Sequence, residues 1–433
     1  MQPDYSNTTS SAYSTEHHRF GQPSAVDLWE VASLLGFPAV LWRLPNQKEK
    51  HLIVSFDEIL PHVSVDLDEL PAGFIISPFD NITDGSSDST EVDRPARTLF
   101  LRADIQAVFP QDNQAHVKST SGETAERFWS FLSTDANNSS KKKSTHPSTL
   151  TALPDPDAQS RYVRNVAKAV EAMQRGAFRK VVLSRTKRVQ FTDAPNAVEL
   201  FDKLCQTYPT AFVSAVSIPE KGQIWMSATP ERLVSIDTDG IFQTTSLAGT
   251  QSALNPDGTP KRPAEAMWSQ KEIEEQALVS RYIIECFKKI RLREYIEEGP
   301  KSIIAGNLMH LGTSFTVDTQ AVRYPQLGTV MLRLLHPTSA VCGTPRDVAF
   351  TFISQHETHD RELYSGFLGP VNMNTTEGSA TDIFVHIRCM KLEGKLATLY
   401  AGAGLTEDSV PEREWQETEM KCQTLLQVMM NDE

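Results

Sequence analysis

The sequence predicts one large α/β or α+β unit with a smaller subdomain. A chain of 433 residues is long for an ordinary single domain but fits such a unit, and it can bury a sizeable core. Hydrophobic residues make up 39% of the chain and charged residues 22%, which is typical of a soluble globular protein. Short apolar runs rich in β-branched residues alternate with stretches of helical period, so the sequence favours a mixture of strands and helices.

The first part of the chain divides into three segments. Residues 1–24 contain acidic side chains and no apolar core, so we expect a disordered tail of a cytoplasmic protein, and neither a signal peptide nor a transit peptide. Residues 25–133 hold short apolar runs such as FPAVLWRL, HLIVSF and AGFIISPF, which predict an N-terminal subdomain of strands and loops. Residues 134–158 are rich in Ser, Thr, Asn, Lys and Pro without an apolar period, which indicates a flexible linker or loop.

A helix and then a strand follow the predicted linker. The stretch KVVLSRTKRVQF, residues 180–191, has the β-branched residues and partial alternation of a strand. The preceding stretch predicts an amphipathic helix that stops at Gly176, and Lys180 therefore falls at a helix–strand turn. The apolar side chains at helical spacing are Tyr162, Val163, Val166, Val170 and Met173.

Glutamates crowd the stretch EREWQETEMK, residues 412–421, near the end of the chain. On a helix, Glu414, Glu417 and Lys421 are spaced three and four residues apart and share one face. Taken alone, this pattern favours a solvated helix face supported by a Glu–Lys pair. A metal or catalytic site is the alternative, and such a site needs partners elsewhere in the chain.

A second glutamate-bearing helix is predicted over residues 266–290. Ile273, Ala277 and Ile284 form its expected apolar stripe, and Glu275 lies off that stripe. If the two helices faced each other, their carboxylates could hold Mg²⁺, which prefers oxygen ligands and retains several waters. Spacing alone still favours a surface explanation for these glutamates.

Several classes of protein are disfavoured by composition and motif content. The formal net charge of −13 argues against a nucleic-acid partner, since phosphate binding relies on clustered Lys and Arg. No uninterrupted apolar run is long enough for a membrane helix, and no nucleotide-binding glycine motif is present. The five cysteines lack CxxC spacing, so we expect reduced, partly buried thiols.

Nine segments follow one another in a recognisable order: KVVLSR, ATPERL, SLAGT, SQKEIEEQALV, MHLGTSF, LLHPTSA, RELYSG, IRCMKL and YAGAGLTEDSVPEREWQETEMK. Together they resemble the chorismate-utilising enzymes, most closely the isochorismate synthases. The resemblance covers residues 159–431, which would form the chorismate-binding catalytic domain. It implies an α+β fold in which two antiparallel β-sheets pack as a sandwich with helices outside, and an active site between the sheets and the two glutamate helices.

The resemblance also implies a metal and substrate site. Glu275 and Glu417 match the glutamates that bind Mg²⁺ in the family, and Glu414 would be a water-mediated or outer ligand. The Mg²⁺ would hold the ring carboxylate of chorismate, while Arg388, in a strand-like segment, and Lys421 are the predicted partners of its other negative groups. Further substrate contacts are implied at Ala248, Gly249, Thr250, His310, Ala340 and Gly402.

The family chemistry adds water at ring C2 while the C4 hydroxyl leaves, which requires a general base and a general acid. Lys180 matches the base and Glu231 matches the acid of the isochorismate synthases. An ordinary lysine is protonated at neutral pH, so burial or a positive neighbour, Arg185 or the metal ion, would have to lower its pKa. Glu231 must conversely keep its proton, which favours an enclosed setting.

The assignment of the chain to one branch of the family depends on fewer residues. Lys180 and Ala340 favour water over ammonia as the nucleophile, so we expect no obligatory glutaminase subunit. We expect a monomer or weak dimer, although no motif bears on the oligomeric state. The alternatives are a salicylate synthase, which would also eliminate pyruvate from isochorismate, and a non-catalytic chorismate-binding homologue. Menaquinone, siderophore and salicylate routes all begin with isochorismate. Gln276 departs from the family, which usually has histidine at this position, as do Ser339 and Gly369–Pro370.

Overall fold

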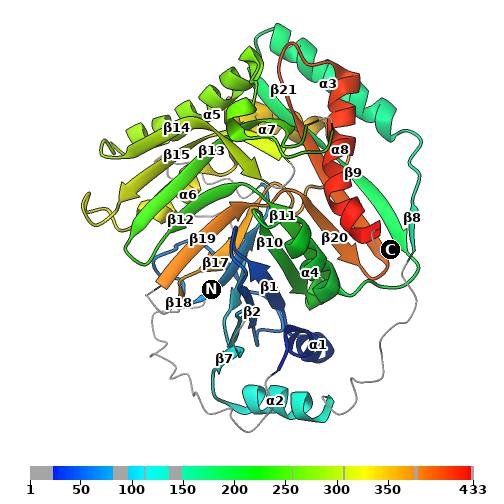
Figure 1. Ribbon diagram of the computed structural model, residues 1–433, viewed down its shortest axis with the longest axis vertical. Helices are drawn as coiled ribbons and strands as arrows, with labels where there is room; N and C mark the ends of the chain where they lie inside the picture. Colours follow the sequence, from blue (N-terminus) through cyan, green and yellow to red (C-terminus); the bar gives the residue numbers. More distant parts are fainter. Residues whose placement is uncertain are drawn as a thin grey trace.

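The computed structural model contains two antiparallel β-sheets that pack face to face, with helices on their outer surfaces (Figure 1). The structure describes residues 23–80, 96–111, 114–135, 149–255, 257–305, 308–374 and 379–430. The α+β sandwich that the resemblance implied is therefore confirmed. The predicted tail of residues 1–24 lies outside the described residues except for its last two positions.

The first sheet carries the strand that begins with Lys180. Its strands are antiparallel to their neighbours throughout the described residues. In spatial order they are β16 (Gly343–Thr344), β9 (Lys180–Phe191), β21 (Leu396–Leu405), β20 (Cys389–Glu393), β11 (Gln223–Thr229), β10 (Phe212–Ile218), β1 (Ala39–Arg43), β2 (Lys50–Val54), β6 (Ile105–Phe109) and β7 (His116–Ser119), with β8 (Leu150–Ala152) also paired to β9.

The second sheet carries the glycine-containing strands that the sequence singled out. Its order is β14 (Ile296–Ala305), β15 (Leu308–Asp318), β13 (Ile241–Ser252), β12 (Arg232–Ile236), β19 (Ser379–Val385), β17 (Phe367–Val371), β4 (Gly73–Ser77), β5 (Thr98–Arg102) and β3 (His62–Val63), with β18 (Met373–Asn374) paired to β19. β13 and β15 pair along most of their length and form a long ribbon.

The core between the sheets is aromatic and aliphatic. The rings of Phe212 on β10 and Phe384 on β19 stack with centroids 4.1 Å apart, which joins one sheet to the other. Trp42 and Trp225 from the first sheet are buried in the same cluster as Phe74 from the second. Because alternate residues of a strand point to opposite faces, the same strands leave their other face for the outer helices.

The helices cover the outer faces of the two sheets. α1 (Ala25–Leu35), α2 (Glu123–Asp135), α4 (Ala197–Thr207) and the end of α8 (Pro411–Met430) pack on the first sheet, together with α3 (Ala158–Gln174) and α7 (Arg346–His356) near β9. α5 (Gln270–Lys289) and α6 (Leu327–Leu335) pack on the second sheet. Two 3-10 turns occupy Pro219–Lys221 and Pro263–Glu265.

The segment predicted as an N-terminal subdomain contributes to both sheets. β1 pairs with β10 of the first sheet, and β4 pairs with β17 of the second. Within the described residues, the segment 25–133 therefore shares both sheets with the remainder of the chain. The described part of the predicted linker also includes a strand, β8, which pairs with the far end of β9.

The predicted helix and strand around Lys180 are confirmed. α3 buries Tyr162, Val166 and Met173, and Gly176 follows the helix with φ of 78°, a left-handed conformation that suits glycine. β9 then begins at Lys180. Local periodicity was sufficient to predict this helix and this strand, because the apolar side chains of both pack against apolar neighbours.

The helix over residues 266–290 is confirmed, but its predicted apolar stripe is wrong. Ile273 is 43% exposed, whereas Gln276 is only 3% exposed. The buried stripe of α5 begins with this polar residue and continues through Val279, Ile283, Cys286 and Phe287. Apolar spacing could not predict where this buried stripe begins, because its first residue is a glutamine.

The five cysteines are buried and free, as predicted. Burial raises the pKa of each thiol, so none is poised as a thiolate nucleophile. In the part of the chain that the structure describes, no helix combines the length and apolar character needed to cross a membrane.

Candidate active site

A cavity of about 800 Å³ lies between the two sheets and the helices α5 and α8. Strands β9 and β21 of the first sheet and β13 and β15 of the second contribute to its wall. The sequence-predicted residues that line it are Lys180, Glu231, Gly249, Glu275, His310, Ala340, Arg388, Glu417 and Lys421. The fold therefore brings together residues from eight of the nine segments that carried the family resemblance.

Lys180 is held in the wall of the cavity at the start of β9 and is 6% exposed. Its neighbour Gly404 on β21 leaves room for the lysine, since a Cβ there would lie 3.3 Å from Lys180 Cε. Burial lowers the pKa of Lys180 below 10.5, and the carboxylates of Glu275 and Glu231 offset part of this effect. The lysine is thus moved toward the neutral form that a general base requires.

The positive neighbour that adds to this lowering of the lysine pKa is Lys421. Arg185, which the sequence suggested, has a different role because it lies five residues along the strand and faces the other side. Its guanidinium donates to Thr418 Oγ1 at 2.7 Å and stacks on Trp415, 3.9 Å from the ring centroid. Arg185 therefore attaches β9 to α8.

Glu231 lies between β11 and β12, and its backbone is held by the amide of Val385, which donates to the Glu231 carbonyl at 2.9 Å. Burial raises the pKa of the Glu231 carboxyl from 4.5 to about 7. The cations Lys180 and Arg388 and a hydrogen bond with Thr338 act in the opposite direction and do not cancel this effect. The carboxyl group therefore holds its proton near neutral pH, as a general acid must.

The raised pKa of Glu231 predicts a pH-dependent stability. Between pH 4.5 and about 7 the folded chain retains a proton at Glu231 that the unfolded chain has lost, so stability falls as pH rises through this window. Glu231→Gln should therefore be more stable than the parent at pH 8, by about 1–3 kcal/mol, with the gain shrinking toward pH 5. Urea unfolding at both pH values measures this difference. Glu412→Gln, at an exposed position of α8, is the control, and an equal gain at both pH values would contradict the assignment.

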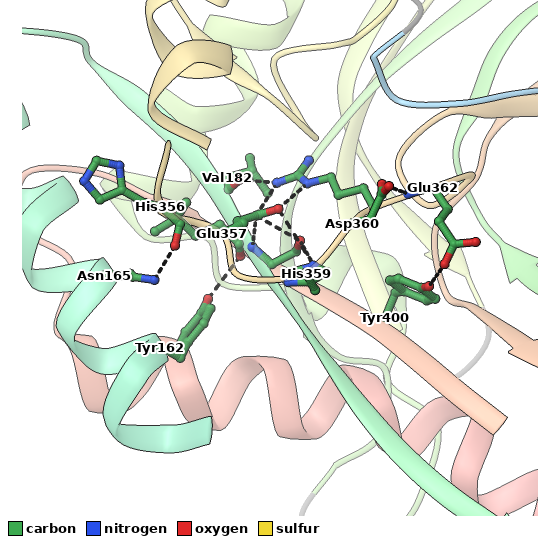
Figure 2. A network of polar contacts seen from close by, with 12 residues as sticks. Tyr162, Asn165, Val182, His356, Glu357, His359, Asp360, Glu362 and Tyr400 are labelled. Atoms are coloured by element: carbon green, nitrogen blue, oxygen red, sulfur yellow. Dashed lines mark hydrogen bonds and ion pairs between the residues drawn. The ribbon is translucent and has the colours of Figure 1, made fainter. Parts of the chain in front are cut away.

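A buried ion pair that includes Glu357 lies beside Val182 on β9, the strand that begins with Lys180 (Figure 2). Arg361 donates to both carboxylate oxygens of Glu357, at 2.6 and 2.8 Å. The same guanidinium donates to the carbonyl of Val182 on β9 at 2.7 Å and to that of Val341 at 2.9 Å. This ties the strand of Lys180 to the turn that carries Ala340, so the RELYSG segment supports the cavity from behind.

The two glutamate helices both contribute carboxylates to the cavity. Glu275 on α5 and Glu417 on α8 line it, and Glu272 lines it while also capping α5 through Ser269. Glu414 is buried on the part of α8 near Tyr162, where burial raises the pKa of the tyrosine and the charge of Glu414 raises it further. Glu414 is not among the described residues that line the cavity.

The donor set fits a cation that uses few protein ligands. Among the residues that the structure describes, no three His, Cys, Asp or Glu side chains converge as a complete metal site. Mg²⁺, however, is usually held by one or two carboxylates together with substrate oxygens and water. Glu275 and Glu417 provide two carboxylates on opposite helices of one cavity, which matches this requirement.

Positive side chains also line the cavity. Lys421 donates to Glu417 Oε1 at 2.6 Å and to the carbonyl of Gly402 at 2.7 Å. Arg388 lies in a bend between β19 and β20 with φ of 48°, so the strand predicted at this residue is wrong. The bend follows from the chain leaving the second sheet for the first, and it directs this arginine to the cavity.

His310 and the 246–250 segment form the wall on the second sheet. His310 Nδ1 lies 3.0 Å from the carbonyl of Gly249, and since a carbonyl only accepts, Nδ1 carries the hydrogen. Burial lowers the pKa of His310 to about 4, so the ring is neutral. Ala248 and Thr250 are placed on β13, while their side chains lie outside the described part of the chain.

Sequence reasoning missed several residues of the cavity. Gly404 belongs to the quoted YAGAGLT segment, and its position two residues after Gly402 on a strand could have indicated it. Thr338 lies behind the lining and bonds Glu231, and it also belongs to a quoted segment. Met420 lines the cavity from the quoted segment of α8, whereas Tyr208 lines it without any signal in the local sequence.

The fold matches those of solved isochorismate synthases and of an anthranilate synthase component I. The model of the chorismate binding enzyme family matches residues 98–430, which is most of the chain, and the chain belongs to this family.

Individual relatives agree with this assignment. Isochorismate synthase EntC of Escherichia coli is 29% identical over 307 residues, covering 69% of this chain and 75% of the relative. Isochorismate synthase DhbC of Bacillus subtilis is 29% identical over 296 residues, covering 67% of this chain and 72% of the relative. The solved structure of MenF, the menaquinone-specific isochorismate synthase from Escherichia coli, shares the fold with a TM-score of 0.71 and 21% identity, covering 96% of this chain and 93% of that one.

Proposed function

We propose that this protein is an isochorismate synthase, which converts chorismate to isochorismate with Mg²⁺ as cofactor. The observation that carries the proposal is the pairing of Lys180 and Glu231 in one cavity, with the lysine pKa lowered and the glutamate pKa raised. Two groups whose pKa values are moved toward neutrality in this way are suited to act as base and acid in one reaction. The names of EntC and DhbC support the same activity.

In the proposed reaction, the neutral amine of Lys180 takes a proton from water as the water oxygen bonds to ring C2. The ring double bonds shift and the C4–O bond breaks, while Glu231 donates its proton so that the hydroxyl leaves as water. Passing the proton from the lysine back to the glutamate would restore the starting state, so the net reaction moves a hydroxyl group without consuming a second substrate.

The cavity also meets the charge requirement of a dianionic substrate in an acidic protein. Arg388 and Lys421 supply fixed positive charge for the carboxylates, and Glu275 and Glu417 would hold Mg²⁺. When bound, the ion would provide positive charge for a substrate carboxylate. The neutral ring of His310 adds polarity without charge.

Incubation of the purified protein with chorismate and Mg²⁺, followed by chromatographic identification of the product, tests the proposal. Isochorismate is the expected product. Accumulation of salicylate and pyruvate would instead support the salicylate synthase alternative, and formation of anthranilate from ammonia would contradict water as the nucleophile. Binding of chorismate without formation of any product would support the alternative of a non-catalytic homologue.

The role of Glu231 predicts a separate result. Glu231→Gln keeps the shape of the side chain but cannot donate a carboxylic proton, so kcat should fall about 100-fold or more. Chorismate binding should persist because the side chains assigned to the substrate carboxylates are unchanged. Steady-state kinetics and a binding titration measure the two effects, and a variant within a few-fold of the parent would remove Glu231 as the acid.

A further inference from the structure

The first two turns of α5 carry Glu275 but little apolar anchoring. Ile273 is 43% exposed, and the first buried apolar side chain of this helix is Val279. Glu272 is engaged in the capping box with Ser269 at the helix start. Among the described side chains of residues 270–278, Gln276 is the one that is fully buried. The attachment of this part of α5 to the second sheet is therefore polar.

Gln276 contacts three hydroxyl groups beneath the helix. Its Nε2 lies 2.7 Å from Thr313 Oγ1 on β15, 2.9 Å from Ser246 Oγ on β13 and 3.0 Å from Ser280 Oγ one turn later on α5. Ser246 and Ser280 also bond each other at 2.8 Å. Ser246 and Thr313 are directly opposite each other in the pairing of the two strands. One amide group thus bridges two strands and its own helix.

The helix geometry connects this contact to Glu275. Consecutive residues on an α-helix are rotated by about 100° around its axis. Once Gln276 is fixed toward the sheet, Glu275 is directed to the side of the helix that borders the cavity. A rotation or shift of these two turns would displace the carboxylate from α8 and from Glu417. Buried hydrogen bonds are directional, so they restrict rotation more than a general apolar contact would.

A second anchor lies just before the helix. Trp268 Nε1 donates to Ser302 Oγ at 2.9 Å on β14, and its ring packs against Gly249, where a Cβ would come within 3.1 Å of it. This contact holds the segment that leads into α5. Loss of the Gln276 contacts alone should therefore loosen the first turns without detaching the whole helix.

We infer that Gln276 is a positioning residue that sets the orientation of the Glu275 carboxylate and, through it, the affinity of the site for Mg²⁺. The inference rests on the proposed function for the identity of the ion. Gln276 itself touches neither the ion nor the substrate. Residues that orient a metal ligand typically change metal affinity 10–100-fold when they are replaced.

The test replaces Gln276 by methionine, which keeps an unbranched side chain of similar length but cannot donate a hydrogen bond. We expect the Mg²⁺ concentration for half-maximal activity to rise about 10–100-fold, while kcat at saturating Mg²⁺ stays close to that of the parent. In the absence of substrate, the affinity for Mn²⁺, measured by electron paramagnetic resonance, should weaken by a similar factor. Amide hydrogen exchange in residues 273–279 should accelerate, with residues 283–289 unchanged.

Gln270→Met is the matched control, because it makes the same substitution at an exposed position of the same helix. It should change neither metal affinity nor exchange. Faster exchange in Gln276→Met with unaltered Mg²⁺ and Mn²⁺ affinity would reduce Gln276 to a structural role and overturn the inference. If the parent enzyme failed to convert chorismate, the proposed function would fall, while Mn²⁺ binding and exchange would still decide the role of Gln276.

A double-mutant cycle with Thr313→Val identifies the path of the effect. Valine matches the shape of threonine and removes the hydroxyl that lies closest to the Gln276 amide. If this contact transmits the orientation, the combined variant should weaken Mn²⁺ binding less than the product of the two single effects. Independent effects of the two substitutions would overturn the role of this contact.

Discussion

Lys180→Ala is expected to bind chorismate but to lose isochorismate formation by about 10²–10⁴-fold, the range for removal of a general base. Binding should persist because Arg388 and Lys421 remain in the cavity to meet the carboxylates. Steady-state kinetics and calorimetric titration with chorismate measure the two effects separately. Normal turnover by the variant would remove Lys180 as the base.

Two further variants make this result specific. Lys180→Met keeps the length of the buried side chain, so it distinguishes loss of the amine from loss of packing against Gly404. Lys187→Ala changes a lysine on the same strand whose ammonium bonds Glu419 at 2.7 Å, and it should retain activity. Thermal unfolding of each variant checks that the fold is intact.

The pH dependence follows from the same pair of groups. The parent rate should rise with pH as Lys180 loses its proton and fall above about pH 7 as Glu231 loses its own. Because the ammonium of Lys180 lowers the pKa of Glu231, replacing the lysine by methionine should raise that carboxyl pKa above 7. Carbon-13 NMR titration of labelled glutamate side chains measures this shift without any turnover.

Removal of the proposed metal ligands is expected to abolish turnover. Glu275→Ala and Glu417→Ala should each lose activity with the fold retained, because both carboxylates border the cavity and neither belongs to the apolar core. Glu417→Gln is a sharper variant, since it keeps an acceptor for Lys421 while removing the charge. The parent should likewise lose activity in excess chelator and regain it on addition of Mg²⁺.

The controls for this prediction are Glu274→Ala on α5 and Glu412→Ala on α8. Both positions are exposed glutamates near the predicted ligands, and neither lines the cavity. Full activity of the parent in excess chelator would exclude a metal requirement. Parental activity in either ligand variant would exclude that residue as a ligand.

Much of the fold near the site could be predicted from local sequence. The helix ending before Gly176 and the strand starting at Lys180 have periodicities that depend on residues a few positions apart. The pairing of Glu417 with Lys421 on α8 follows from their i,i+4 spacing, and their side chains meet at 2.6 Å. Such features need no knowledge of distant parts of the chain.

The orientation of α5 could not be predicted in this way. Apolar spacing placed Ile273 inside, but the hydroxyl groups of Ser246 and Thr313 provide a polar surface that Gln276 satisfies. These partners come from strands far away in the sequence, so only the assembled sheet makes the buried glutamine favourable.

The sequence by itself determined the family and the mixed α+β composition, and it predicted a lysine, an acid and two helix glutamates for chorismate chemistry. The tertiary structure decided how these groups are placed and charged. Lys180 and Glu231 have ordinary pKa values in an unfolded chain, and burial in a shared cavity moves them in opposite directions. The tertiary structure also decided that the described strands of residues 25–133 extend both sheets. Strand pairing depends on sheet edges that form only when the whole chain has folded.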